Sequence, residues 1–179
     1  MGHETDILFA TIALILASIG AVYDVLQRRI PNLLSYGGIV AGLGLRTAIL
    51  GWQGVTTALV GGLLAGGLFL LVYITSGMGA GDVKLMAAVG CISGPALALE
   101  IAMACGLAGG VMAIAFMIWR RSTLSTLHNV GQLIRFRLAH AVREHPTINL
   151  NNPSAIRLPY GVAIAAGASY PVLAYLFAR

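Results

Sequence analysis

The sequence predicts an all-α, polytopic integral membrane protein with six transmembrane helices and a cytoplasmic amphipathic helix between the fifth and sixth. Of the 179 residues, 58% are hydrophobic and 9% are charged, against about 25% charged in an ordinary soluble domain. The apolar residues fall in runs of near membrane length, and the basic residues fall mainly in the connections between those runs. We expect residues 1–179 to form one transmembrane domain.

Six apolar segments define the expected spans, at about 7–23, 33–50, 55–75, 83–94, 96–119 and 160–178. The flank before the first segment is acidic and holds no Lys or Arg, so we interpret this segment as a retained helix rather than a signal peptide. The fourth segment is short, because even from residue 80 to residue 93 a helix covers only about 20 Å. Either the bilayer thins there or the Asp82 end lies in a water-filled hollow, and we favour the hollow.

Small residues within the segments predict how the helices pack. Three glycine pairs have the GxxxG spacing that lets helix backbones approach closely, namely Gly38/Gly42, Gly62/Gly66 and Gly106/Gly110. Cys91 and Cys105 both lie in apolar stretches, and the sequence has no CxxC zinc motif. We expect both cysteines to be small core residues rather than disulfide partners or metal ligands.

The basic residues predict the orientation in the membrane. With six spans, the connections 24–32, 76–84 and 120–158 share one side and hold nine of the eleven Lys and Arg residues. The positive-inside rule makes this side cytoplasmic and places both termini on the extracytoplasmic side. The net charge of +5 is therefore assigned to membrane topology, and no nucleic-acid-binding module accompanies it.

The 120–158 connection is expected to contain an amphipathic helix. Apolar residues recur there at spacings of three and four from Ser122 to Val142. A helix of this kind is expected to lie on the anionic inner leaflet, and packing against a partner protein is the alternative. His128, His140 and His145 lie in the same connection, but their spacing suits no compact metal site.

Asp24 is the first candidate functional residue, because a carboxylate next to hydrocarbon usually marks a functional site. It ends the first expected span and is followed by Ile30-Pro31-Asn32. Pro31 breaks the helix, and Asn32 is expected to cap the second span. A weak ion pair with Arg28, one helical turn away, is the alternative role for Asp24.

Asp82 is the second candidate, within Gly79-Ala80-Gly81-Asp82-Val83-Lys84. Gly79 and Gly81 permit close backbone approach, and Asp82 is expected in the first turn of the fourth helix, where the helix dipole favours a negative charge. A simple N-cap after a flexible turn is the alternative. Lys84 is two residues from Asp82 and cannot face it on a helix, so we expect it to extend toward the lipid headgroups.

Two carboxylates that meet at one water molecule have the equipment of an aspartic protease. Like charges a few ångströms apart cannot both ionise readily, so the pair shares a proton. The ionised member then acts as general base on water, and the protonated member donates to the scissile carbonyl oxygen.

A small proton-coupled transporter or channel subunit with the aspartates as a relay is the alternative function. A transporter needs access from both sides, whereas both aspartates are expected to open to the cytoplasm.

The sequence resembles the type IV prepilin peptidase family of GxGD-type intramembrane aspartic proteases. Three motifs carry the resemblance, in chain order: Asp24 with Ile30-Pro31-Asn32, the segment 79–84, and Pro159-Tyr160-Gly161-Val162-Ala163-Ile164-Ala165. The resemblance implies that Asp24 and Asp82 are the catalytic dyad, with motif support from Gly79, Gly81, Lys84, Pro31 and Asn32. It also implies prepilin and pseudopilin substrates, cut between a basic leader and a hydrophobic helix at the cytoplasmic face of the bacterial inner membrane. It implies no metal and no cofactor.

One departure from the family narrows the implied function. Bifunctional members carry a cytoplasmic insert with paired CxxC motifs and also methylate the new N-terminus, whereas this chain has neither the insert nor a CxxC motif. The chain is therefore similar to the short, peptidase-only members that serve Flp-type (tight-adherence) pili. We expect Pro159 to start the last helix and Gly161 to allow close packing near the dyad, with substrate contact as the alternative.

Overall fold

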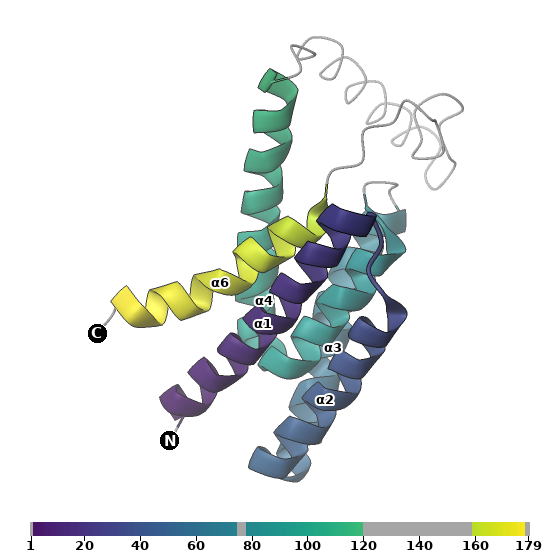
Figure 1. Cartoon of the computed structure of the whole chain (residues 1–179). Helices are drawn as coiled ribbons and strands as arrows, with labels where there is room; N and C mark the ends of the chain where they lie inside the picture. Colours follow the sequence, from purple (N-terminus) through teal and green to yellow (C-terminus); the bar gives the residue numbers. More distant parts are fainter. Residues whose placement is uncertain (1, 75–77, 120–158, 178–179) are drawn as a thin grey trace, which may run out of the picture.

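The computed structural model describes residues 2–74, 78–119 and 159–177. These residues form five helices and no strand, which confirms the all-α class (Figure 1). The helices are α1 (Gly2–Gln27), α2 (Asn32–Leu50), α3 (Trp52–Ile74), α4 (Ala80–Trp119) and α6 (Tyr160–Phe177). Each helix is long and apolar enough to cross a membrane.

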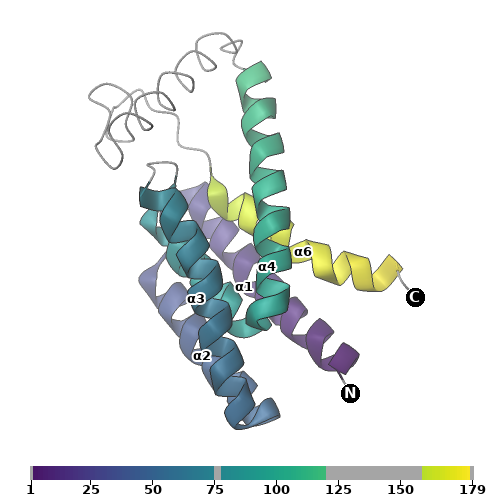
Figure 2. The same ribbon diagram turned by 180° about the vertical axis from the view of Figure 1, so that it is seen from behind.

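Helix α4 covers two of the six predicted spans and is broken between them. Gly94 has φ 76° and ψ 174°, far from helical values, and Pro95 follows it. Glycine tolerates this backbone conformation, and proline has no N–H to continue the helical hydrogen bonds. Figures 1 and 2 show α4 changing direction sharply along its length. The described residues thus form five helices, one of which is broken, and the count of six spans is not confirmed.

The first half of α4, residues 80–93, lies at the centre of the bundle. Helix α4 contacts all four other described helices, and nearly every residue from 85 to 94 is buried. A helix that is apolar on all sides is stable where other helices surround it. The second half, residues 95–119, packs against α6, where a Cβ atom added to Gly167 would clash with Ile101 and Cys105.

Two of the three predicted glycine pairs pack helices together. A Cβ atom at Gly38 or Gly42 would meet α4, and one at Gly62 or Gly66 would meet Cys91 or Ala87 of the same helix. The prediction was wrong for the third pair, because nothing in the described structure lies within 4 Å of a Cβ atom built on Gly106 or Gly110. The buried residues of the second half of α4 are Ala98, Ile101, Cys105 and Gly109, so the two glycines lie on its outer side.

The two ends of α1 lie differently with respect to α6. In Figure 1 the N-terminal end of α1 lies away from the start of α6, which lies beside the end of α1. The placement of both termini on the extracytoplasmic side and the cytoplasmic orientation of the aspartates stay predictions. The amphipathic helix expected between residues 122 and 142 lies outside the described residues.

Candidate active site

Asp24 lies in the last turn of α1, which runs on to Gln27, beyond the predicted end of the first span. Arg28 then adopts a left-handed conformation with φ 52°, and its N–H donates a hydrogen bond of 2.8 Å to the Asp24 carbonyl oxygen. A left-handed residue is a common way for a helix to end. The end of α1 thus places the Asp24 side chain beside the start of α6.

The Asp24 carboxylate is held by the first turn of α6. Its Oδ2 accepts a hydrogen bond of 2.8 Å from the Gly161 N–H. The first N–H groups of a helix have no partner within the helix and carry a partial positive charge, so a carboxylate satisfies both needs. A Cβ atom at position 161 would lie 2.9 Å from Asp24 Cβ and 3.1 Å from its Oδ2. Only glycine therefore fits this contact without a shift of the carboxylate.

Asp82 lies in the first turn of α4, as predicted. Its Oδ2 accepts a hydrogen bond of 3.2 Å from the Gly79 N–H, and its own N–H donates 3.1 Å to the Gly79 carbonyl oxygen. This is the acidic half of a capping box, in which the third helical residue reaches back to the capping residue. The alternative of Asp82 as the N-cap itself was wrong, since α4 begins at Ala80.

One oxygen of the Asp82 carboxylate has no partner. The side chain is 7% exposed, and Oδ1 makes no hydrogen bond within the described structure. Buried polar atoms are almost always hydrogen-bonded, so an unpaired one is unusual and often belongs to a functional site. The predicted water-filled hollow at Asp82 stays a prediction.

The segments that carry the two carboxylates are adjacent, since a Cβ atom built on Gly81 would lie 3.3 Å from Ile30 Cβ. The Tyr160 ring of α6 lies beside the second half of α4, 3.8 Å from a Cβ atom built on Gly109. Cys105 and Cys91 are buried and free, which confirms them as core residues. The candidate site therefore combines α1, both halves of α4 and the start of α6. Among the described residues no group of three His, Cys, Asp or Glu side chains could hold a metal ion.

The role predicted for Asn32 was wrong. It is the first residue of α2, the capping position is Pro31, and no side chain in the described part of the chain caps the helix. Asn32 Oδ1 instead accepts a hydrogen bond of 3.0 Å from Lys84 Nζ. Lys84 also lies over the Tyr36 ring, 5.2 Å from its centroid, so it contacts α2 rather than extending freely toward headgroups.

Sequence reasoning overlooked Arg46, which it used only to count charges. The side chain is 6% exposed and lies over the Phe9 ring, 4.4 Å from its centroid. Its Nε donates to Thr57 Oγ1 at 3.1 Å, and its Nη1 donates to the Ile92 carbonyl oxygen at 3.0 Å. Arg46 thus satisfies a carbonyl beside the break in α4. Its position inside an apolar segment was the signal that could have marked it.

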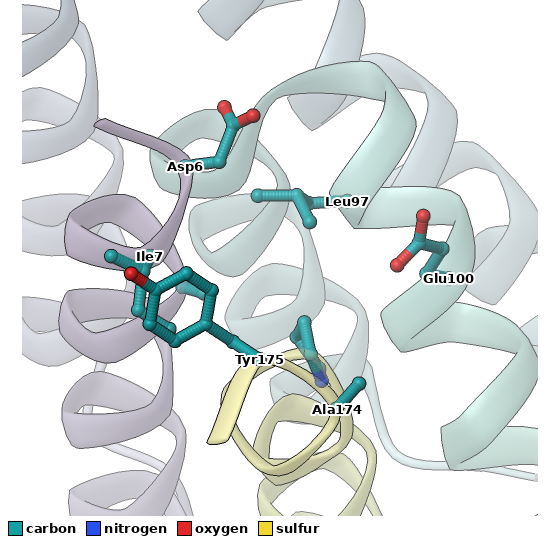
Figure 3. Close-up of a pocket in the computed structure, with 8 residues that line it drawn as sticks. Asp6, Ile7, Leu97, Glu100, Ala174 and Tyr175 are labelled. Carbon is teal, nitrogen blue, oxygen red and sulfur yellow. The ribbon is translucent and has the colours of Figure 1, made fainter. Parts of the chain in front are cut away.

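A pocket of about 350 Å³ lies between α1, α4 and α6 (Figure 3). Asp6, Glu100 and Tyr175 line it, and Figure 3 shows the two carboxylates on different helices. Asp6 precedes Asp24 by 18 positions on the same helix, a separation of about 27 Å at the usual rise per residue. The pocket is therefore separate from the aspartate pair.

Comparison with known proteins places the chain among peptidases. The sequence model of the type IV leader peptidase family matches residues 8–114. This range contains Asp24 and the whole segment 79–84, and it ends before Pro159. No curated protein and no solved structure matches the chain.

Proposed function

Because the chain belongs to the type IV leader peptidase family, we propose that it is an aspartic endopeptidase in which Asp24 and Asp82 cleave prepilin leaders. Family membership establishes a peptidase that acts on prepilin-like substrates in general. The aspartic mechanism, the choice of Flp-type substrates and the absence of methyltransferase activity are our proposals. So are a single domain over residues 1–179 and an active site that faces the cytoplasm of a bacterial inner membrane.

The observation that carries the proposal is that Asp24 and Asp82 lie on adjacent segments and that one backbone N–H holds each carboxylate. Gly161 holds Asp24, and Gly79 holds Asp82. Fixing one oxygen of each carboxylate orients its other oxygen. Groups that are already oriented need little free energy to rearrange during a reaction. Asp82 Oδ1 is buried and has no partner among the described residues, which suits an atom that bonds to a water molecule or a substrate during the reaction.

The proposed reaction needs only the pair, one water molecule and the peptide bond. One carboxylate takes a proton from water as the water oxygen bonds to the scissile carbonyl carbon. The other, protonated carboxyl donates its proton to the carbonyl oxygen, giving a neutral tetrahedral intermediate. Collapse of the intermediate breaks the C–N bond, and the leaving amine takes a proton from the pair. The products are a leader with a free carboxylate and a mature pilin with a free amine.

The substrate must reach the pair as an extended strand. A helical carbonyl is hydrogen-bonded within its helix and is not open to attack, so the start of the pilin helix must unwind first. The basic leader is expected to approach from the end of the bundle where the aspartates lie. The hydrophobic pilin helix is expected to stay in the bilayer, which many exposed apolar side chains of this chain are suited to contact.

The test is cleavage of an Flp-type prepilin by the wild type and by Asp24→Asn and Asp82→Asn. Each Asn variant keeps the side-chain size but removes the acid, so both are expected to leave the prepilin uncut, as judged by gel mobility. Asp6→Asn and Glu100→Gln are matched controls and are expected to process normally, because both residues line the separate pocket. Normal processing by either dyad variant would overturn the mechanism. Mass measurement of the mature N-terminus tests methylation, and we expect an unmethylated amine.

A further inference from the structure

We propose that the hydrogen bond between Lys84 Nζ and Asn32 Oδ1, called here the interlock, sets the separation of the two aspartates. The inference rests on the proposed aspartic mechanism. Asn32 and Lys84 are positioning residues, since they act through the backbone segments that carry Asp24 and Asp82. The interlock joins residues 52 positions apart in the chain, with 3.0 Å between its two atoms.

On one side the interlock connects to Asp24 through a short, constrained segment. Arg28 N–H is bonded to the Asp24 carbonyl oxygen at 2.8 Å, and the Pro31 carbonyl oxygen accepts from the N–H groups of Leu34 and Ser35 at 3.1 and 3.4 Å. Proline also fixes its own φ angle. A displacement of Asn32 is therefore passed to the end of α1 instead of being absorbed by a loose loop.

On the other side the interlock connects to Asp82 through one helical turn. Lys84 follows Asp82 by two residues in α4, and the backbone between them is held by helical hydrogen bonds. A second contact runs parallel to the interlock, since a Cβ atom at Gly81 would lie 3.3 Å from Ile30 Cβ. The segments 24–32 and 79–84 are thus joined at two points, one apolar and one polar.

The chemistry of Lys84 suits the interlock. An ammonium group donating to an amide oxygen makes a stronger hydrogen bond than a neutral donor. The Tyr36 ring, 5.2 Å from Nζ, stabilises the charge on its other side. Asn32 and Tyr36 both belong to α2, so Lys84 attaches the Asp82 turn to the first two turns of that helix.

The kinetic test uses Lys84→Met and Asn32→Leu, each of which removes one member of the interlock. Both are expected to lower kcat about tenfold or more, because the carboxylates are then held less accurately in the reactive geometry, and to leave KM for the prepilin unchanged. Lys84→Arg is expected to keep most of the wild-type kcat, because a guanidinium group can also donate to Asn32 Oδ1. Leu33→Ala is the matched control, since Leu33 is adjacent and 85% exposed.

A double-mutant cycle tests whether Lys84 and Asn32 affect kcat through one shared hydrogen bond or through two independent effects. Lys84→Met/Asn32→Leu is expected to lose no more kcat than either single variant, because one hydrogen bond can be lost only once. If the two single losses in kcat multiply in the double variant, the proposal is overturned. A raised KM with unchanged kcat would also overturn it, because Lys84 would then contact the substrate. If Asp24→Asn abolishes cleavage and Lys84→Met does not slow it, the interlock fails and the proposed function stands.

A distance measurement tests the interlock without activity. Spin labels at Leu26→Cys and Ala80→Cys report on the end of α1 and the start of α4, in a protein with Cys91→Ala and Cys105→Ala. Lys84→Met and Asn32→Leu are each expected to broaden or shift the distance distribution, and Leu33→Ala is expected to leave it unchanged. Distance distributions of Lys84→Met and Asn32→Leu that match those of the labelled parent protein would overturn the proposal. This holds even where a variant is too unstable for kinetics.

Discussion

Gly161 and Asp24 lie 137 positions apart in the sequence and share a hydrogen bond of 2.8 Å. The contact joins the start of the last described helix to the end of the first. It makes the Pro159-Tyr160-Gly161 motif part of the candidate site, because the motif supplies the N–H that holds one carboxylate. The position of Asp24 therefore depends on α6 as well as on its own helix.

Gly161→Ala is expected to reduce leader cleavage at least tenfold. The added Cβ atom would lie 2.9 Å from Asp24 Cβ and 3.1 Å from its Oδ2, closer than ordinary contacts allow, so the carboxylate must move. A displacement of about 1 Å at a catalytic group can lower the rate by about a hundredfold. The measurement is the initial rate of prepilin cleavage by purified enzyme. Gly44→Ala is the matched control, as nothing in the described structure lies within 4 Å of its Cβ position. Equal rates for the two variants would contradict the role given to Gly161.

Local sequence signals predicted the all-α class and the helices, and they also marked Asp24 and Asp82 as site candidates. The predicted boundary between the spans 83–94 and 96–119 coincides with the break at Gly94 and Pro95 in α4, and apolar length marked the helices, because such features act within a few residues. The contacts Gly161–Asp24 and Lys84–Asn32 join distant residues, and no local pattern encodes them. Asn32 was assigned as a cap from its type alone, whereas the tertiary contact with Lys84 uses its side chain. Gly106 and Gly110 have the packing spacing but face outward, since the pattern does not say which face has a neighbour.

Gly94→Ala is expected to lower the thermal unfolding temperature in detergent. The φ of 76° at this position is strained for a residue with a Cβ atom, by about 1–3 kcal/mol. The added Cβ atom would also lie 2.7 Å from Arg46 Nη2. Gly106→Ala is the control, because that glycine is helical and its Cβ position is open, so alanine is expected to be neutral or stabilising by about 0.5–1 kcal/mol. Equal unfolding temperatures for the two variants would refute the strain at Gly94.

Arg46→Met is expected to destabilise the bundle by about 1–3 kcal/mol, because it leaves the Ile92 carbonyl oxygen without its side-chain donor. The contact with the Phe9 ring is lost as well. Arg46→Lys keeps the charge but not the guanidinium fork that reaches both Ile92 and Thr57, so an intermediate unfolding temperature is expected. Thr57→Val removes only the bond from Nε and should have the smallest effect. An Arg46→Met protein as stable as the wild type would show that apolar packing replaces these bonds.

Val83→Cys is expected to react with a small, hydrophilic thiol reagent added from the cytoplasmic side. The predicted hollow brings water to the start of α4, and Val83 is partly buried beside Asp82. The native thiols give little background, as Cys91 is 5% and Cys105 is 3% exposed. Leu63→Cys is the control, because Leu63 is 75% exposed on the apolar helix α3, where lipid rather than water is expected. Inside-out and right-side-out vesicles distinguish the two sides of the membrane. Complete protection of Val83→Cys from both sides would exclude the hollow, and reaction from the extracytoplasmic side alone would reverse the predicted orientation.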